Sequence, residues 1–178
     1  MQKLYRVYLL LGSNIGDRKG IIEKADKLLI DKLLPDYLDV TDLSEAVRTS
    51  SISETEQWGI FEKQLGETGN IIPIEKFMNQ AFMCLTYKEP QEVLDICLET
   101  EKELGRKRKE ERLPQDLNKR KYLSRNIDID ILKIFAESNH GEGNTICAEL
   151  QINTEKLIVP HARLKERPFA RKLLKEIL

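Results

Sequence analysis

The segment RNIDIDIL, residues 125–132, alternates isoleucine with two aspartates, Asp128 and Asp130. Successive side chains of a β-strand point to opposite faces of the sheet, so this alternation predicts a strand, which we expect over 127–135. The isoleucines would pack into a core while both carboxylates project from the other face.

Two carboxylates that lie this close repel each other unless a cation lies between them. Carboxylate oxygens are hard ligands and suit Mg²⁺ held jointly with substrate phosphates. On this segment alone, an amphipathic edge strand with a solvated acidic face explains the pattern about equally well. The metal site is therefore one of two interpretations at this point.

A strongly basic segment, residues 102–125, precedes the predicted strand. Its cations are Lys102, Arg106, Lys107, Arg108, Lys109, Arg112, Lys119, Arg120, Lys121 and Arg125. An arginine-rich loop beside an acidic strand is expected where a polyphosphate is held next to its metal ions. Taken alone, such a run is more often a solvated helix end or a nucleic-acid patch.

Strands and helices are expected in an α+β order along the rest of the chain. The expected elements are a buried strand over 5–11, a helix from Asp17 to Pro35, extended chain over 37–53, a polar loop over 53–72, a strand over 73–87, a helix from Pro90 to Gly105, a turn around 139–144, an extended pair over 145–160 and a helix from Pro168. Apolar periodicity and the Gly and Pro positions define these bounds. The order predicts one domain, residues 1–178, with an α+β sandwich of ferredoxin-like character.

Charge and cysteine content argue against several classes of protein. Lys plus Arg (29) nearly equals Asp plus Glu (30), so the whole chain has no field that would attract nucleic acid or a membrane. Cys84, Cys97 and Cys147 show neither metal nor redox spacing, which predicts reduced cysteines in the core. We find no signal segment or membrane span and expect a cytoplasmic protein.

Glu101 and the glycine positions bear on phosphate binding. Glu101 lies at helical spacing from Leu94 and Cys97, near an apolar face, where an acid is either a ligand or a structural hydrogen-bond acceptor. Neither a Walker A sequence nor GxGxxG occurs in the chain, so side chains would have to hold any phosphates.

Three further residues could form a flat slot for a planar heterocycle. Phe77 and Phe169 could stack on its faces while Asn79 orients its edge, although core packing is the stronger interpretation for either phenylalanine taken alone. His161 follows Val159-Pro160, and a lone histidine in a turn is usually a surface residue.

Five motifs together resemble the hydroxymethyl-dihydropterin pyrophosphokinase family. They are LGSN at 11–14, FMNQA at 77–81, ELGRKR at 103–108, RNIDIDIL at 125–132 and LIVPHARLKERPF at 157–169, in family order. The resemblance implies a ferredoxin-like three-layer α-β-α sandwich with a mainly antiparallel sheet. It also implies transfer of pyrophosphate from ATP to the hydroxymethyl group of 6-hydroxymethyl-7,8-dihydropterin, giving the pterin diphosphate and AMP, in folate biosynthesis.

The same resemblance implies roles for individual residues. Catalysis would involve Asp128, Asp130, Arg108 and Arg112, with two Mg²⁺ ions bridging the aspartates and the triphosphate. ATP would contact Glu101, Arg108, Arg125, Ile127, Lys156, Ile158, His161 and Arg167. Pterin would contact Thr49, Ser50, Ile52, Phe77, Asn79 and Phe169. Residues 108–124 would form a mobile lid that orders when both substrates are bound, because this cationic segment, interrupted by Pro114, buries little apolar surface alone.

The chain also departs from the family pattern. Leu113 stands where a tryptophan is common, and extra residues before Arg125 make the implied lid longer. Ser50 and Ser51 stand where prolines are frequent, and Ala162 replaces a common aromatic. Trp58, in the 53–72 loop, is a candidate closing aromatic.

Two other functions stay open from the sequence. A nucleotidyltransferase of the GS…DxD type also joins a Gly-Ser turn to paired aspartates, but in that family the two elements lie close together, whereas Ser13 and Asp128 are far apart. A nucleic-acid-binding module using the 102–125 segment would bind in a salt-dependent way without needing the aspartates. We expect small-molecule substrates, no nucleic-acid or membrane partner, and a monomer, with a dimer left open.

Overall fold

The fold is described from a computed structural model of the chain. The described residues are 3–36, 43–55, 63–65, 71–73, 76–106, 126–140 and 144–178. The predicted lid over 108–124, Trp58 and the three arginines Arg108, Arg112 and Arg125 lie outside the described residues.

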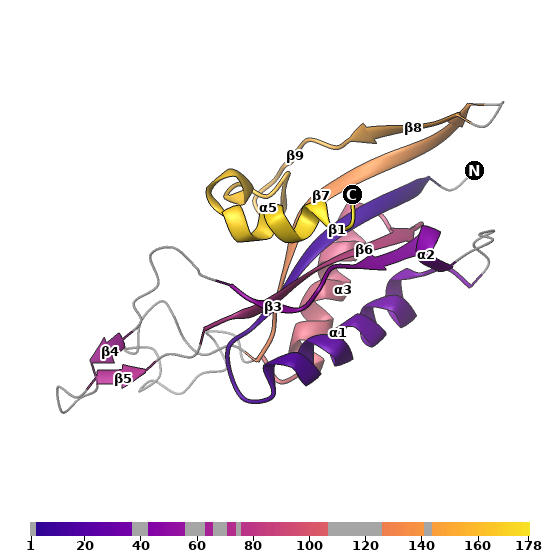
Figure 1. The fold of residues 1–178 in the computed structure, drawn as a ribbon. Helices are drawn as coiled ribbons and strands as arrows, with labels where there is room; N and C mark the ends of the chain where they lie inside the picture. The colour runs from indigo at the N-terminus through magenta and orange to yellow at the C-terminus, as the bar shows by residue number, and fades with distance from the viewer. Residues whose placement is uncertain are drawn as a thin grey trace.

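An antiparallel sheet forms the centre of the molecule (Figure 1). Its strands are β1 (Leu4–Ser13), β2 (Val47–Thr49), β3 (Ser53–Glu54), β6 (Met78–Thr86), β7 (Asp128–His140) and β8 (Asn144–Glu149). The strand order is β2-β6-β1-β7-β8, and β3 also pairs with β6. Two small pairs are separate from this sheet, β4 (Lys63–Leu65) with β5 (Ile71–Pro73) and β9 (Ile152–Asn153) with β10 (Ile158–Val159).

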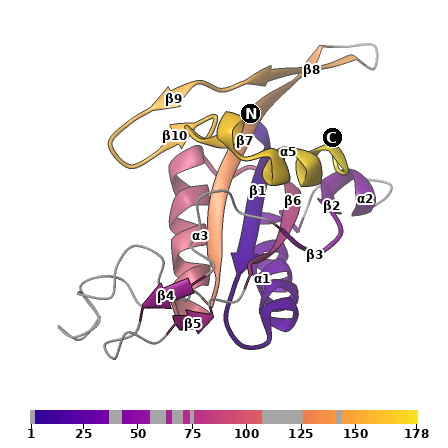
Figure 2. The same ribbon diagram turned by 60° about the vertical axis from the view of Figure 1, so that its left-hand side comes forward.

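Helices cover both faces of the sheet. The described helices are α1 (Arg18–Leu33), α2 (Leu43–Ala46), α3 (Pro90–Glu103), the 3₁₀ turn η2 (Leu164–Glu166) and α5 (Pro168–Lys175). The long helices α1 and α3 lie on one face and α5 crosses the other (Figures 1 and 2). This arrangement confirms the predicted α+β sandwich with a mainly antiparallel sheet.

The central strand β1 is buried on both faces, which explains its nearly continuous apolar sequence. Val7, Leu9 and Leu11 join the core beneath α1 and α3, whereas Tyr8 and Leu10 join the core beneath α5. Full burial of one such aliphatic side chain contributes roughly 1.5–3 kcal/mol. The two cores therefore fix the register of β1, on which the positions of the functional residues depend.

The ends of the two long helices follow the predicted signals. Asp17 caps α1, and its carboxylate accepts a hydrogen bond from the Gly20 N–H at 3.0 Å. A Cβ at position 20 would lie 2.1 Å from Oδ2 of that carboxylate, so a larger residue would force the Asp17 side chain to shift. Helix α3 begins with Pro90 and is followed by Gly105, whose φ of +87° suits glycine.

Three expectations about loops are wrong. Residues 43–46 form a helical turn rather than extended chain, in keeping with the helix-favouring Leu, Glu and Ala of that stretch. The predicted polar loop over 53–72 contains β4 and part of β5, which pair with each other. Within the turn predicted around 139–144, Asn139, His140 and Asn144 lie in strands instead, because β7 and β8 pair there and satisfy the backbone groups despite their polar side chains.

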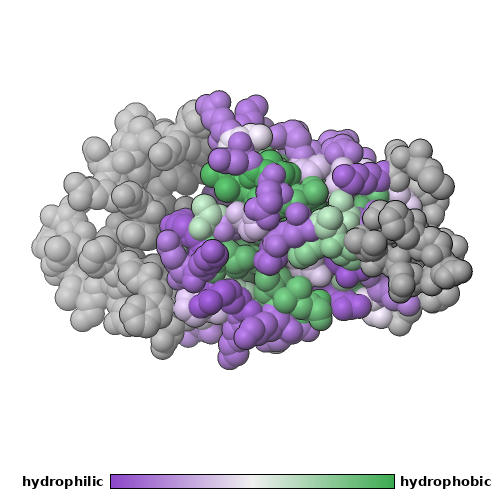
Figure 3. Space-filling model, turned by 90° about the horizontal axis from the view of Figure 1, so that it is seen from above, coloured by the Kyte–Doolittle hydropathy of each residue, from purple (hydrophilic) through white to green (hydrophobic). Residues whose placement is uncertain are grey.

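The surface on the α5 side mixes hydrophobic and hydrophilic residues (Figure 3). In the part of this face that the structure describes, hydrophilic side chains separate the hydrophobic areas. All three cysteines are free; Cys84 and Cys97 are buried as predicted, whereas the prediction of a core position is wrong for Cys147, which is exposed. Among the described helices, none has the length and apolar character needed to cross a bilayer.

Candidate active site

The register of the central strands brings three of the sequence motifs into one row. Gly12 of β1 pairs with Asn79 of β6 on one side and with Asp128 of β7 on the other. In the next row, Leu10 pairs in the same way with Ala81 and Asp130. Residues directly opposite each other in antiparallel strands present their side chains to the same face. Asn79 and the two aspartates therefore share the face that α5 partly covers.

Gly12 leaves the space between Asn79 and Asp128 free of a side chain. A Cβ at this position would lie 2.6 Å from Oδ1 of Asn79 and 3.5 Å from Cδ1 of Phe77. A contact of 2.6 Å is too short for a carbon and an oxygen that are not bonded, so a larger residue would displace the Asn79 amide. The glycine of the LGSN motif thus leaves room for the Asn79 side chain of the neighbouring strand β6.

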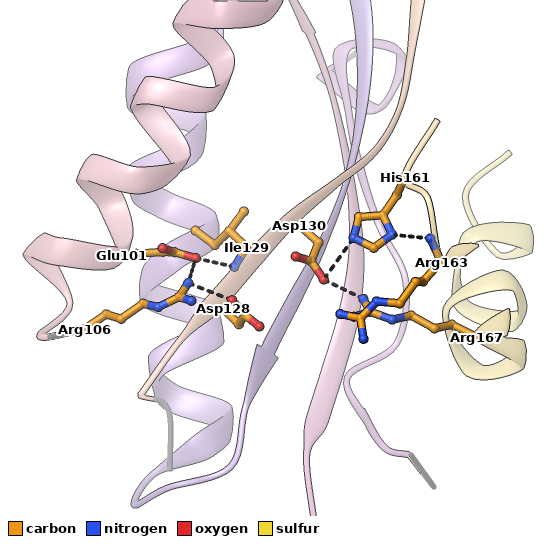
Figure 4. A network of polar contacts seen from close by, with 8 residues as sticks. All are labelled: Glu101, Arg106, Asp128, Ile129, Asp130, His161, Arg163 and Arg167. Carbon is orange, nitrogen blue, oxygen red and sulfur yellow. Dashed lines mark hydrogen bonds and ion pairs between the residues drawn. The ribbon is translucent and has the colours of Figure 1, made fainter. Parts of the chain in front are cut away.

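Each aspartate of β7 is paired with an arginine (Figure 4). Nη1 of Arg106 lies 2.7 Å from Oδ1 of Asp128, and Nη1 of Arg167 lies 2.6 Å from Oδ2 of Asp130. The aspartate side chains are 20% and 27% exposed, so both carboxylates remain accessible from solvent. The predicted alternation is confirmed, because Ile127, Ile129 and Ile131 are buried in the opposite core.

Glu101 lies behind Asp128, at the end of α3. It is 3% exposed and accepts hydrogen bonds from the Arg106 guanidinium and, at 2.8 Å, from the Ile129 N–H. Burial raises the pKa of Glu101 to about 7, against the lowering effects of Arg106 and the Ile129 N–H. The predicted position of Glu101 near an apolar face is confirmed. In this structure its carboxylate acts as a hydrogen-bond acceptor for Arg106 and the Ile129 N–H.

His161 reaches the same aspartate from the C-terminal segment. Its backbone N–H donates to the Leu132 carbonyl at 2.9 Å, and its Nε2 lies 3.9 Å from Oδ2 of Asp130. The Arg163 N–H donates to its Nδ1 at 3.2 Å. Burial lowers the pKa of His161, although Asp130 raises it. A neutral ring whose Nδ1 accepts a hydrogen bond carries its proton on Nε2, the nitrogen that faces Asp130.

The donor set of this site suits a metal shared with phosphates. Among the described residues, no group of three or more His, Cys, Asp or Glu side chains could hold a metal ion. Mg²⁺ does not need such a cage, since it commonly binds one or two carboxylates and completes its octahedron with water and substrate phosphates. Asp128 and Asp130, two accessible carboxylates on one strand face, fit this ion.

The three residues predicted to form a slot are only partly brought together. Asn79 is 2% exposed, and its Nδ2 donates to Oγ1 of Thr55, a residue that the sequence did not single out. Phe77 is half-buried, and its carbonyl accepts a hydrogen bond from the Thr55 N–H at 3.0 Å. Phe169, half-buried in the first turn of α5, packs against the core that contains Leu10.

The other predicted site residues differ in exposure. Thr49 is exposed, Ile52 is half-buried and Ser50 is buried against β6. Lys156 is exposed in the connection between β9 and β10, and Ile158 is 48% exposed. Ile127 is fully buried in the core, so only its backbone could reach a ligand.

Arg106 was not assigned a role from the sequence, although it belongs to the basic segment. It contacts both Glu101 and Asp128. Its place directly after Gly105, the residue that ends α3, was the available signal.

Comparisons with known proteins extend over nearly the whole chain. A family model described as 7,8-dihydro-6-hydroxymethylpterin-pyrophosphokinase matches residues 8–178. A 2-amino-4-hydroxy-6-hydroxymethyldihydropteridine pyrophosphokinase from Bacillus subtilis is 34% identical over 170 residues, which are 96% of this chain and 76% of that protein. Its namesake from Aquifex aeolicus is 36% identical over 163 residues, 92% of this chain and 74% of that protein. A folate synthesis bifunctional protein from Arabidopsis thaliana is 28% identical over 173 residues, 97% of this chain but 27% of that protein.

Proposed function

This chain belongs to the 7,8-dihydro-6-hydroxymethylpterin-pyrophosphokinase family, and from that membership we propose how its own residues perform the reaction. The enzyme transfers pyrophosphate from ATP to the hydroxymethyl group of 6-hydroxymethyl-7,8-dihydropterin in folate synthesis, and ATP is its co-substrate. The observation that carries the proposal is the row of Asn79, Gly12 and Asp128 across three strands.

Asp128 and Asp130 would hold two Mg²⁺ ions together with the triphosphate. When bound, Mg²⁺ supplies charge neutralisation and alignment of the phosphoryl oxygens. The alternation along β7 supports this role, because it presents both carboxylates to one face at adjacent positions. The arginines now beside them offset their mutual repulsion.

The cations of the site would bind the phosphates of ATP. A guanidinium presents a planar fork of N–H donors that matches phosphate oxygens. Arg106 and Arg167, at the two carboxylates, would turn to the triphosphate, and the protonated Nε2 of neutral His161 could donate alongside them. From the family resemblance we add Arg108, Arg112 and Arg125, and also Glu101, Ile127, Lys156 and Ile158 as further ATP contacts.

The pterin would bind on the other side of Gly12. Asn79 would orient the pterin edge, Phe77 and Phe169 would stack on its faces, and Thr49, Ser50 and Ile52 would complete the wall. Thr55 supports this assignment, since it fixes the Asn79 amide by accepting from its Nδ2. A pterin held in this way would direct its hydroxymethyl oxygen towards the aspartates.

The reaction then follows from alignment of the two substrates. The hydroxymethyl oxygen attacks the β-phosphorus of ATP and releases its proton to solvent, a new oxygen–phosphorus bond forms, and the bond from the β-phosphorus to the bridging α-phosphate oxygen breaks so that AMP leaves. Preorganised cations around the phosphates stabilise the charge that builds up in such a transfer. We also propose a single domain, which the pairing of β1 with β7 supports, acting as a monomer in the cytoplasm.

One assay tests these residue roles together with the activity. The protein is incubated with Mg²⁺, ATP and 6-hydroxymethyl-7,8-dihydropterin, and AMP and pterin diphosphate are quantified for the wild type and Asp128→Asn. We expect pterin-dependent AMP release from the wild type and almost none from the variant. Asp95→Asn, a matched change at an exposed position of α3, is the control. Equal AMP release from wild type and Asp128→Asn would overturn the metal assignment.

A further inference from the structure

Strands β2 and β3 are separated by a bulge opposite β6. Thr49 pairs with Phe82, whereas Ser53 pairs with Asn79. Four steps along the chain therefore face three steps of β6, so one extra residue lies between the two strands. Such bulges re-aim side chains and often lie next to active sites.

The inner side of this bulge is fixed to β6 by Ser50. Its N–H donates to the Ala81 carbonyl at 2.9 Å, and its Oγ accepts from the Ala81 N–H at 2.9 Å. Nε2 of Gln80 donates to the Ser50 carbonyl at 3.0 Å. The Ser50 side chain thus takes the place of a backbone acceptor, and the ladder continues past the extra residue.

The outer side of the bulge is fixed to the C-terminal helix by Ser51. The N–H and the hydroxyl of Ser51 both donate to Oε2 of Glu176, each at 2.9 Å. Glu176 caps the C-terminal end of α5. These two donors lower the pKa of Glu176, because they stabilise its charged form. We call this pair of hydrogen bonds the Ser51–Glu176 clasp.

The clasp contributes little to the stability of the fold. Both residues are exposed, and water competes for exposed hydrogen bonds. A carboxylate at a helix C-terminus also lies at the negative end of the helix dipole, where it is unfavourable. Glu176 is therefore unfavourably placed for the stability of α5. Such an exception to the usual helix preferences points to a role in the site rather than in the fold.

We propose that the Ser51–Glu176 clasp is a positioning device for the pterin pocket. It joins the wall formed by Thr49 and Ile52 to α5, whose first turn carries Phe169. The first of these bonds needs a backbone N–H at position 51, which a proline there could not supply. This inference rests on the proposed assignment of these residues to pterin.

Loss of the clasp would leave the wall to be ordered by the pterin itself. Ordering a segment on binding weakens affinity, so Glu176→Ala and Ser51→Ala should each raise the KM for pterin, by about two- to tenfold. The KM for ATP and kcat should stay within about twofold, since neither residue lies at the phosphate site. Glu176→Gln should recover much of the affinity, because its amide oxygen can still accept.

The experiment measures kcat and both KM values for Glu176→Ala, Glu176→Gln, Ser51→Ala and the double variant, with Lys175→Ala on the same helix as control. We expect the two alanine effects to be less than additive, because they break one interaction. An unchanged pterin KM in both Glu176→Ala and Ser51→Ala, or an equal rise in the KM for ATP, would overturn the proposal. If Glu176→Ala does not fold, Ser51→Ala decides it alone, and an unchanged pterin KM in that variant would overturn the proposal.

Phe169→Ala separates this proposal from the one on which it rests. Weaker pterin binding by Phe169→Ala, with wild-type behaviour of the clasp variants, would reject the clasp and keep the pocket. Wild-type pterin binding by all of these variants would reject the placement of the pocket itself and the clasp with it.

Discussion

Arg106 lies between a buried and an accessible carboxylate, in contact with Glu101 and with its Nη1 2.7 Å from Oδ1 of Asp128. One guanidinium therefore joins the end of α3 to the acidic row of β7. Any cation that binds Asp128 has to compete with this arginine. If Arg106 turned to phosphate as proposed, Glu101 would keep the hydrogen bond from the Ile129 N–H but lose its contact with the guanidinium.

Replacement of Arg106 should therefore affect both rate and stability. We expect Arg106→Ala to lower kcat about 100-fold, the usual cost of removing one preorganised donor. The free energy of unfolding should fall by about 1–3 kcal/mol, because Glu101 stays buried without its cation. Steady-state kinetics and urea unfolding measure the two effects, with the exposed Arg171→Ala as control. Turnover near the wild-type level would show that Arg106 is only structural.

Loss of either β7 aspartate should abolish turnover without unfolding the chain. We expect Asp128→Ala and Asp130→Ala to reduce AMP formation by about 10³-fold or more, since the metal clamp would lose half of its protein ligands. The circular dichroism spectrum should stay unchanged, because both carboxylates are partly exposed. Mg²⁺-dependent ATP binding, measured by calorimetry, should weaken in parallel. Normal AMP formation by either variant would leave the acidic row as a solvated face.

Loss of aromatic stacking in the pterin slot should weaken the binding of pterin but not of ATP. We expect Phe169→Ala to weaken pterin binding about two- to tenfold, as an aromatic pair contributes about 0.5–1.5 kcal/mol beyond burial. ATP binding should change far less. Calorimetry with each ligand separately distinguishes the outcomes, and a loss of ATP affinity with unchanged pterin affinity would reverse the placement.

A methyl group at position 12 should disturb the pterin side of the row. The Cβ of Gly12→Ala would lie 2.6 Å from Oδ1 of Asn79, and overpacking of this kind typically costs about 1–3 kcal/mol. We expect a lower melting temperature and weaker pterin binding. The double variant Gly12→Ala with Asn79→Ala should regain stability, because the clash is removed, but not pterin affinity. Full pterin affinity in Gly12→Ala would mean that the Asn79 amide can move without consequence.

Asp26 of α1 should make the stability depend on pH. Burial raises the pKa of Asp26 to about 7, with a contribution from Glu23, and its Oδ1 has no hydrogen-bond partner in the described structure. An acid whose pKa is raised by folding binds its proton more tightly when folded, so stability falls as pH rises from about 4 towards 7.

The matched variant Asp26→Asn cannot ionise and should remove this dependence. We expect the free energy of unfolding of Asp26→Asn to exceed that of the wild type by about 1–3 kcal/mol at pH 8 and by clearly less at pH 5. Chemical unfolding at the two pH values measures the difference. A gain of the same size at both would show that the charge of Asp26 is not involved.

Much of the fold could be predicted from local signals. The helix-ending residues Pro35 and Gly105 mark real boundaries, because each acts through its own backbone geometry. The apolar run before Gly12 locates β1, although the strand continues through Gly12 to Ser13. The alternation of isoleucine and aspartate around Asp128 likewise determines, without other information, that the two aspartates share one face of β7. Residues 43–46 were missed because a single helical turn has no periodicity to detect.

Contacts between distant parts of the chain could not be predicted in the same way. The partners of Asp128 and Asp130 depend on where α3 ends and where α5 begins against the sheet, which no local pattern encodes. Ser51 and Glu176 are 125 positions apart, and nothing in either neighbourhood indicates the other. Thr55 was missed for a related reason, since only the pairing of β3 with β6 brings it to Asn79.

The position of Gly12 between two functional strands has a consequence for substrate size. Asn79 and Asp128 are separated by two strand spacings, which amount to about 10 Å across the sheet. Backbone hydrogen bonds set this distance, so side-chain changes in either half of the site can alter affinity but cannot bring the halves closer. A pterin whose reactive oxygen sits on a longer or shorter arm than hydroxymethyl would bind and yet miss the phosphorus. With the proposed pterin and metal roles of Asn79 and Asp128, strand β1 would set the acceptor length that the enzyme can use.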